Sequence, residues 1–218
     1  MTERLMRIFN EIPNCKSFAD VGCDHGFIAE QMIKSGKCSL VTISDISEPS
    51  LEKARKLLKK YIDLGMVLPV CTDGLKGINT NTEVVLIAGM GGEEIIKILQ
   101  ESAFLPPILV LQPMKNVEKV RRKLFELGYA INKDYLFYDK KYYNLLVCEL
   151  GKECEPYSEK EFIFGRTNLQ EMSEDFVIFL TDEIKFMNDC ISLIISKEIK
   201  LEMHAKLALY KEVLYGNK

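Results

Sequence analysis

Seven residues concentrate the groups that can do chemistry: Asp20-Val-Gly-Cys-Asp-His-Gly26. They directly follow the apolar residues Phe18 and Ala19, and this arrangement is typical of a strand that turns through glycines into a helix. Such a turn brings the backbone close to a ligand, and the free N–H groups at the helix start can bind it. The stretch therefore predicts a nucleotide-cofactor pocket, with an ordinary strand-to-helix turn as the alternative.

The charge of this turn narrows the choice of cofactor. Its two carboxylates, Asp20 and Asp24, would repel the pyrophosphate of a nicotinamide dinucleotide. They would attract S-adenosylmethionine, which carries a cationic sulfonium and a cationic α-ammonium group. We therefore expect this cofactor, with S-adenosylhomocysteine as its product, to contact Asp20, Gly22, Cys23, Asp24 and Gly26.

Four more predicted cofactor contacts follow the next two strands. Asp45 lies 19 residues beyond Gly26, close to the spacing expected for an acid that binds ribose hydroxyls, and Ile46 lies beside it. At Asp73-Gly74 a carboxylate can accept from the adenine amine while the glycine leaves room for the ring. Each aspartate alone is equally consistent with a helix cap or a turn. Three of them after successive strands favour the pocket.

A glycine-rich loop, Ile87-Ala-Gly-Met-Gly-Gly92, is expected at the mouth of the same pocket. Its backbone groups can contact the cofactor and the edge of a methyl acceptor at Ala88, Gly89 and Met90. A loop with only a conformational role is the alternative.

The elements that position these residues alternate along the chain. Five short apolar runs predict a parallel sheet, at residues 17–21, 40–43, 67–71, 84–88 and 108–111. Helices are expected between them, most clearly at 50–64 and 117–127, and an antiparallel hairpin at 135–138 and 144–150 closes the sheet. The fold class is therefore α/β and Rossmann-like, with ligands beyond the carboxyl ends of the strands.

Length and composition limit the number of domains and the class of protein. At 218 residues and 47% hydrophobic content, one α/β domain and a small extension are expected. No apolar run approaches the roughly 18 residues that span a bilayer, so we expect a cytoplasmic protein without membrane contact. Seven cysteines without a C-x-x-C pair, and only His25 and His204, predict neither a metal site nor a disulfide framework.

Asp20-Val-Gly-Cys-Asp-His-Gly26 is followed in order by Asp73-Gly-Leu75, Ile87-Ala-Gly-Met-Gly-Gly92 and Leu111-Gln-Pro113. This series resembles the bacterial tRNA methyltransferases that modify N1 of adenine 22. The resemblance covers most of residues 1–150. It implies a class I methyltransferase domain, S-adenosylmethionine as donor, tRNA as partner and a helical C-terminal domain of coiled-coil type. The family commonly has serine, tyrosine and asparagine at the positions of Cys23, Phe27 and Met114.

Such a reaction needs few titratable groups. Adenine N1 carries a lone pair at neutral pH, so catalysis would depend on positioning rather than on a strong base. We expect Asp24 to stabilise the cationic product and His25 to orient the reactants, with a purely structural histidine as the alternative. Phe27 could stack on an adenine that has left its base stack.

Basic residues cluster in one region. Between Gln112 and Lys141 there are eight Lys and Arg residues against four acids, although the whole chain has a net charge of −3. We predict RNA phosphate contacts at Arg4, Arg7, Lys115, Lys119, Arg121 and Arg122. A solvated helix face is the alternative.

The remaining residues, 156–218, are predicted to form a second domain after the methyltransferase domain at 1–155. Residues 167–215 contain no proline or glycine and have apolar residues at roughly heptad spacing. This pattern predicts a long amphipathic helix, with a second helix at 201–214 that folds back on it. The segment is net acidic, so it would recognise tRNA shape or serve as a scaffold or dimer contact; a monomer is expected.

Two other classes of function stay open. One is a methyltransferase that acts on a small molecule or a protein, and the other is a non-catalytic binding module on the same fold. The glycine loop and the basic region favour the tRNA enzyme.

Overall fold

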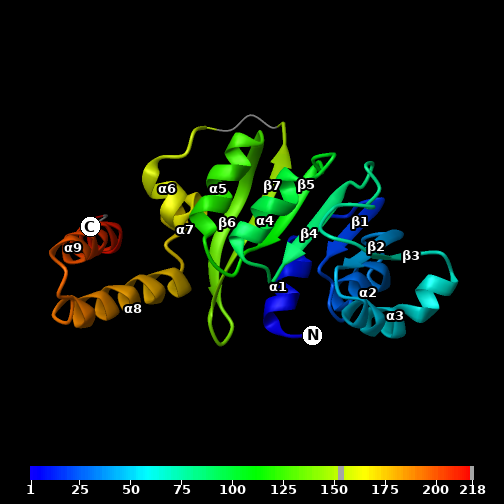
Figure 1. Cartoon of the computed structure of the whole chain (residues 1–218), viewed down its shortest axis with the longest axis horizontal. Coiled ribbons are helices and arrows are strands. Elements are labelled where there is room, and N and C mark those ends of the chain that lie inside the picture. The colour runs from blue at the N-terminus through cyan, green and yellow to red at the C-terminus, as the bar shows by residue number, and fades with distance from the viewer. Residues whose placement is uncertain (152–154, 217–218) are drawn as a thin grey trace.

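The computed structural model describes residues 1–151 and 155–216. Its sheet has seven strands in the order β3-β2-β1-β4-β5-β7-β6, and the five strands β1 to β5 are parallel (Figure 1). Strands β6 and β7 form the antiparallel hairpin that closes the sheet. The expected α/β, Rossmann-like fold is thereby confirmed. The strands are β1 Ser17–Val21, β2 Leu40–Asp45, β3 Val67–Cys71, β4 Val84–Ala88, β5 Ile108–Gln112, β6 Tyr129–Tyr138 and β7 Tyr142–Leu150.

Helices cover both faces of the sheet. One face packs against α1, α2 and α3, and the opposite face packs against α4, α5 and α6. These helices bury apolar stripes while their charged faces meet solvent. Their bounds are α1 Glu3–Glu11, α2 Phe27–Lys34, α3 Glu48–Asp63, α4 Gly92–Gln100, α5 Val117–Glu126 and α6 Glu159–Phe164.

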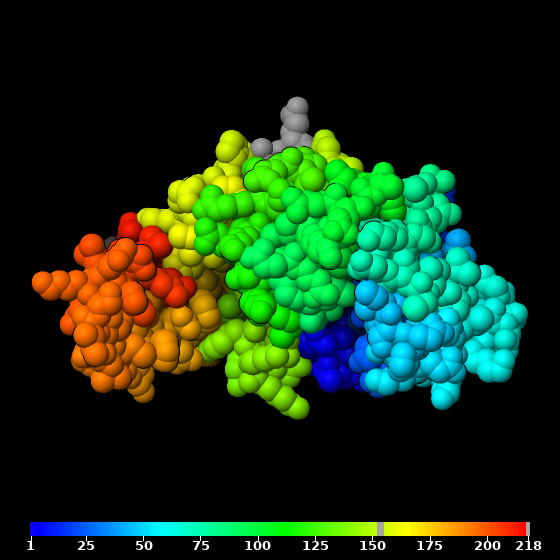
Figure 2. All heavy atoms as spheres, in the orientation of Figure 1, coloured from blue at the N-terminus to red at the C-terminus, as the bar shows by residue number. Residues whose placement is uncertain are grey.

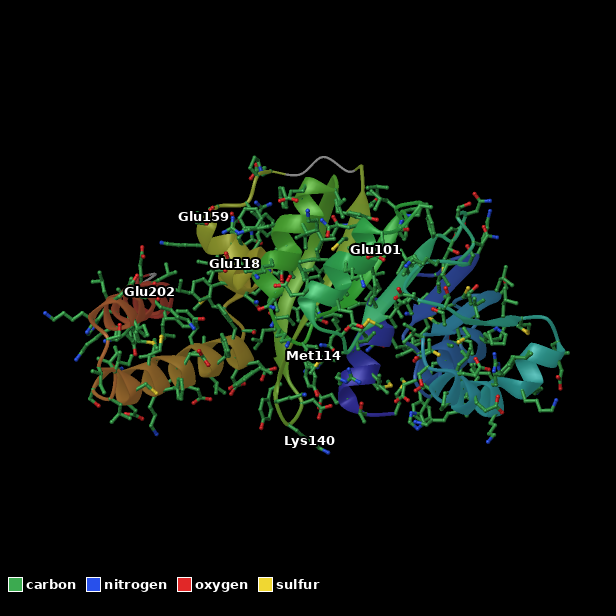
Figure 3. All side chains as sticks on the ribbon, in the orientation of Figure 1. Glu101, Met114, Glu118, Lys140, Glu159 and Glu202 are labelled. Carbon is green, nitrogen blue, oxygen red and sulfur yellow. The ribbon has the colours of Figure 1, made fainter. Side chains whose placement is uncertain are left out.

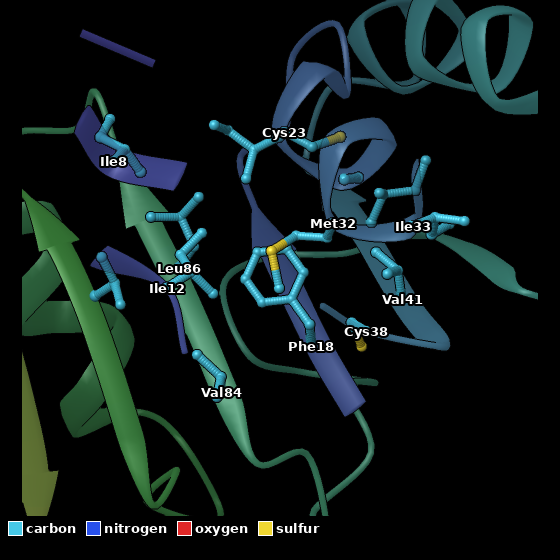
Figure 4. Close-up of a cluster of buried hydrophobic side chains, with 14 of the residues drawn as sticks. Ile8, Ile12, Phe18, Cys23, Met32, Ile33, Cys38, Val41, Val84 and Leu86 are labelled. Carbon is cyan, nitrogen blue, oxygen red and sulfur yellow. The ribbon is translucent and has the colours of Figure 1, made fainter. Parts of the chain in front are cut away.

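Helix α1 was not predicted from the sequence. Ile8 is fully buried on it, and Ile12 follows directly at its C-cap; both pack toward Phe18 of β1 and Val84 of β4 (Figure 4). Thr2 caps the helix by accepting a hydrogen bond from the backbone N–H of Leu5. The segment is rich in charged residues, so the helical spacing of its apolar residues, three or four positions apart, is not evident in the sequence. The helix matters because it extends to the carboxyl edge of the sheet.

Strand β6 is longer than expected. It starts at Tyr129 instead of residue 135, because a register shift between Ile131 and Lys133 allows pairing through a polar stretch. The stretch Asn132-Lys133-Asp134 has the composition of a turn, but Asp134 is fully buried.

The long helix predicted from residue 167 onward is interrupted, whereas the predicted second helix that folds back on it is present as α9 Lys197–Tyr215. The interrupted part contains α7 Arg166–Glu171 and α8 Glu174–Ile191. Met172 takes a left-handed conformation with φ 45°, and Ser173 caps α8 by accepting from the N–H of Phe176. The expected seam between the two last helices does exist and involves Phe176, Leu180, Met187, Leu207 and Tyr210, with Ile184 and Val213 completing it.

Helix α9 packs on α8 and α6 away from the sheet (Figure 1), whereas α8 also reaches the sheet, where Asp175 and Asp182 accept hydrogen bonds from the β6–β7 hairpin. Helix α6 packs on α5, where the rings of Phe162 and Phe125 lie 5.5 Å apart. The domain boundary between residues 155 and 156 stays a prediction. Residues 152–154 of the first predicted domain and residues 217–218 of the second lie outside the described ranges. Within those ranges no helix is long and apolar enough to cross a bilayer.

Candidate active site

A cavity of about 520 Å³ opens at the carboxyl edge of the parallel strands, on the side where Figure 1 shows the N-terminus. Parallel strands bring their carboxyl ends to one edge, so residues far apart in sequence meet there. The cavity is lined by all the predicted cofactor residues except Gly26: Asp20, Gly22, Cys23, Asp24, Asp45, Ile46, Asp73, Gly74, Ala88, Gly89 and Met90.

Two glycines of the lining combine a left-handed backbone conformation with close neighbours. A Cβ on Gly22, whose φ is +72°, would lie 2.2 Å from the Cε of Met90. A Cβ on Gly74, whose φ is +59°, would lie 3.1 Å from the side chain of Ile98. Both positions therefore favour glycine for its conformation as well as for space.

Gly26 has a packing role that was not predicted from the sequence. It lies at the N-cap of α2 with φ +74°, outside the cavity lining. A Cβ there would lie 2.9 Å from Leu58 and 3.1 Å from the Cβ of Ala54, both on α3. Gly26 thus allows α2 and α3 to approach each other, and its contact with the cofactor stays a prediction.

Asp20 is the most buried carboxylate of the cavity, with 6% of its surface exposed. Burial raises its pKa to about 7 and the nearby Asp45 adds to this, while a backbone hydrogen bond from Ala29 acts in the opposite direction. A cationic ligand would favour the ionised form. The lining also includes Asp24, Asp45, Asp73 and Glu94, so this set of donors fits a cofactor with positive charge, as S-adenosylmethionine has.

Two of the lining aspartates also organise their own turns. The Oδ1 of Asp45 accepts from the N–H of Ser47 at 2.8 Å, and Asp73 forms an ion pair with Lys76 at 3.2 Å. The turn role and the ligand role of these residues are therefore compatible.

The three predicted catalytic residues lie together at the cavity mouth. The Nδ1 of His25 is 2.8 Å from Asp24, and Lys53 lies 3.5 Å from the other oxygen of that carboxylate. Burial tends to raise the pKa of Asp24, but His25 and Lys53 outweigh it and lower the pKa. The His25 ring stacks on Phe27 with centroids 5.5 Å apart, and Phe27 is 44% exposed. An aromatic platform thus borders the cavity.

The glycine loop after β4 is held by the segment after β5. The N–H of Gly89 donates to the carbonyl of Gln112 at 3.0 Å, and the N–H of Met114 donates to the carbonyl of Met90 at 2.8 Å. A Cβ on Gly92 would lie 2.5 Å from the carbonyl oxygen of Lys115. The loop is therefore anchored at both ends, with its backbone directed to the cavity mouth.

Sequence reasoning missed several lining residues. Leu5 and Arg4 reach the cavity from α1, and Arg4 donates to the fully buried Gln112 at 2.7 Å. Arg4 was predicted only as an RNA contact, and that role stays a prediction. Thr72, Glu94 and Ile98 also line it. For Glu94 a signal existed, because it lies in the first turn of the helix after the glycine loop.

Arg121 does not belong to an RNA-binding surface, contrary to the prediction. It is 1% exposed and forms a two-pronged ion pair with the buried Asp134, with bonds of 2.7 and 2.9 Å. It also donates to the carbonyls of Phe162 and Ile163 at 3.0 Å. Arg121 thus joins α5, β6 and α6, and its charge is unavailable to a phosphate.

Three of the other predicted RNA contacts form ion pairs with acidic side chains, and one does not. Lys119 pairs with Glu93 at 2.6 Å, and Arg7 pairs with Glu3 at 3.0 Å. Arg122 pairs with Glu118 at 2.9 Å and Glu159 at 2.6 Å. Lys115 is exposed and has no ion pair among the described residues. The RNA role of these four residues stays a prediction.

Strand order and an acidic cavity at the carboxyl edge define the class: a Rossmann-like domain that binds a nucleotide cofactor. The family model described as "Methyltransferase domain" matches residues 1–146, and the chain belongs to this methyltransferase family.

The relatives and solved structures that the chain resembles are consistent with this methyltransferase family. A Mycoplasma pneumoniae protein named "Putative tRNA methyltransferase" is 31% identical over 69% of this chain and 71% of its own. The Bacillus subtilis tRNA (adenine(22)-N(1))-methyltransferase is 28% identical over 72% of this chain and 68% of its own. A Streptococcus pneumoniae structure, described as a "putative tRNA (m1A22) methyltransferase" in complex with S-adenosyl-L-methionine, shares the fold with a TM-score of 0.89, at 24% identity, over 99% and 100% of the chains.

Proposed function

We propose that this chain transfers a methyl group from S-adenosylmethionine to N1 of adenine 22 in tRNA. The observation that carries the proposal is one cavity in which carboxylates from successive strand ends face an anchored glycine loop. The names of the Bacillus subtilis and Mycoplasma pneumoniae relatives support tRNA as the substrate. We place the protein in the cytoplasm, where tRNA is modified, and expect a monomer.

The cavity residues would divide the cofactor between them. Asp45 binds the ribose hydroxyls and Asp73 accepts from the adenine amine, since they follow β2 and β3 at the expected end of the sheet. Asp20 and Asp24 line the cavity from the first turn, and their negative charges would bind the cationic amino acid portion. The bound cofactor supplies an electrophilic methyl group on a positively charged sulfur.

The remaining residues act on the acceptor. Adenine N1 attacks with its own lone pair, forming the N–CH₃ bond as the S–CH₃ bond breaks, so no residue needs to remove a proton first. Asp24 stabilises the positive charge that passes to the base, and His25 fixes the orientation of Asp24. Phe27 stacks on the extruded adenine and offsets part of the cost of unstacking it, a few kcal/mol.

The test is a transfer assay with methyl-labelled S-adenosylmethionine and unmodified tRNA. Nuclease digestion and mass spectrometry then identify the labelled nucleoside and its position. We expect N1-methyladenosine at position 22, and no label in a matched transcript that carries guanine there. Cofactor binding without label in the adenine-22 tRNA would disprove the proposal.

A further inference from the structure

We infer that the tip of the β6–β7 hairpin, residues 138–142, binds the phosphate backbone of the RNA substrate. The inference rests on the proposed function, because it assigns the surface that holds the RNA while adenine enters the cavity. It replaces the part of the predicted basic surface that the structure shows to be paired with acids.

The first argument is position. Strand β7 is antiparallel to β5. Of the β7 residues that pair with β5, Leu146 lies nearest the hairpin tip, opposite Leu111. Lys141 lies beyond Leu146 by roughly 16 Å of extended chain. The tip therefore projects past the carboxyl edge of the sheet, the same edge that holds the cavity. It protrudes from the molecular surface between α1 and α8 (Figure 2), and Lys140 points outward from it (Figure 3).

The second argument is charge. Lys140 and Lys141 are both exposed, and neither has an ion-pair partner among the described residues. Lys141 lies over the ring of Tyr143, 5.2 Å from its centroid. This contrasts with Lys119 and Arg122 on α5, whose charges are balanced by neighbouring acids. Unpaired cations beside a substrate cavity are what RNA phosphates bind.

The third argument is rigidity. Three carboxylates hold the hairpin around its tip. Asp139 accepts from the N–H of Arg4 at 2.9 Å, so the tip is fixed to the helix that lines the cavity. Asp175 accepts from the N–H of Tyr138 at 3.0 Å, and Asp182 accepts from the hydroxyl of Tyr142 at 3.1 Å. These acids are engaged with the hairpin, and the two lysines are presented from a fixed support.

The fourth argument is backbone conformation. Lys140 has φ +63°, a left-handed conformation that glycine and asparagine adopt at lower energy. A lysine at such a turn position costs conformational energy that its side chain does not recover through any hydrogen bond, ion pair or ring contact with the described residues. Strained positions of this kind are concentrated at functional sites. Beside it, Tyr138 is 49% exposed and offers a ring for an unpaired base.

The test compares two double variants that each remove two adjacent lysines. The first is Lys140→Gly with Lys141→Ala, in which glycine suits the left-handed position better than lysine does. The control is Lys59→Ala with Lys60→Ala at the end of α3, which runs back to the opposite edge of the sheet. Both changes alter the net charge equally.

For each variant, binding of fluorescently labelled tRNA is measured at several salt concentrations, together with the kcat and KM of methyl transfer. For the hairpin variant we expect tRNA affinity to fall about 3- to 10-fold and the slope of log K against log salt to decrease by about 1 to 2. The kcat at saturating tRNA, the affinity for S-adenosylhomocysteine and the melting temperature should stay unchanged. The control variant should match the unmodified protein throughout.

Equal tRNA affinity and equal salt slopes in the two variants would overturn the inference, even if methylation of adenine 22 is observed. Binding that depends on the hairpin lysines, without methylation, would instead support the RNA surface and reject the proposed reaction. A loss of melting temperature in the hairpin variant would also contradict the inference, because it would assign the lysines a structural role.

Discussion

Asp20 combines charge with burial at the centre of the proposed cofactor pocket. Its pKa is raised to about 7 mainly by burial, whereas an exposed aspartate titrates near 3.9. The folded protein therefore holds this proton between about pH 4 and pH 7, and stability decreases as pH rises through that window. A cationic ligand reverses the effect by stabilising the ionised form.

Replacement of Asp20 by asparagine should separate stability from binding. Above pH 7, Asp20→Asn should stabilise the ligand-free protein by on the order of 2 kcal/mol, because an uncompensated buried charge is removed. Below about pH 4 the gain should disappear. The same variant should bind S-adenosylmethionine at least about tenfold more weakly. Thermal unfolding at several pH values and calorimetric titration check both effects, and the exposed Asp63→Asn serves as control; a variant that loses stability at pH 8 would contradict the argument.

Asp24 allows a second test at the cavity mouth. Its φ is +46°, a conformation that asparagine also tolerates, so Asp24→Asn removes charge without a change of backbone. We expect the single-turnover rate of methyl transfer at saturating tRNA to fall about tenfold. Melting temperature and tRNA affinity should be unchanged. An unaltered rate would show that Asp24 does not stabilise the methylated base.

At the scale of elements, the glycine loop and the segment after β5 form one hydrogen-bonded unit, to which α1 adds through Arg4 and Gln112. On the other side of the sheet, Arg121 and Asp134 tie α5 and β6 to α6. The cavity mouth and the helical C-terminal region are thus fixed to the sheet by polar contacts between distant segments.

The buried Arg121 to Asp134 pair gives an element-scale prediction. Arg121→Met should lower the free energy of unfolding by about 3–5 kcal/mol, because Asp134 is left buried and unpaired. Adding Asp134→Leu should recover much of that loss. The neighbouring Arg122→Met, which breaks two surface ion pairs and the contact of the guanidinium with the Phe162 ring, should cost about 1–2 kcal/mol. Urea unfolding compares the three variants; equal losses for Arg121→Met and Arg122→Met would refute this account.

At the scale of the whole molecule, ligand binding should be coupled to stability because the cavity residues come from β1 to β4 and the loops around them. S-adenosylhomocysteine at 100 times its Kd should add about 2.7 kcal/mol to the free energy of unfolding, and raise the melting temperature by several degrees. NADH at the same concentration should produce no shift, since the acidic cavity repels its pyrophosphate. A comparable shift with NADH would point to a dinucleotide site.

The sequence alone determined the sheet and most of the cavity. Parallel strands in βαβ order place their carboxyl ends at one edge, so glycines and aspartates after successive apolar runs were enough to predict Asp20, Asp45 and Asp73 together. Short-range patterns carry this information, because each strand and the turn that follows it are contiguous in the chain.

Only the tertiary structure decided which charges are free. Arg121 meets Asp134, and Arg122 meets Glu159, across sequence separations that no local pattern reports. Tertiary packing also brought α1 to the cavity and divided the C-terminal helix at Met172. The physical reason is that burial and ion pairing depend on partners from other elements, whereas strand and turn formation depend mainly on neighbouring residues.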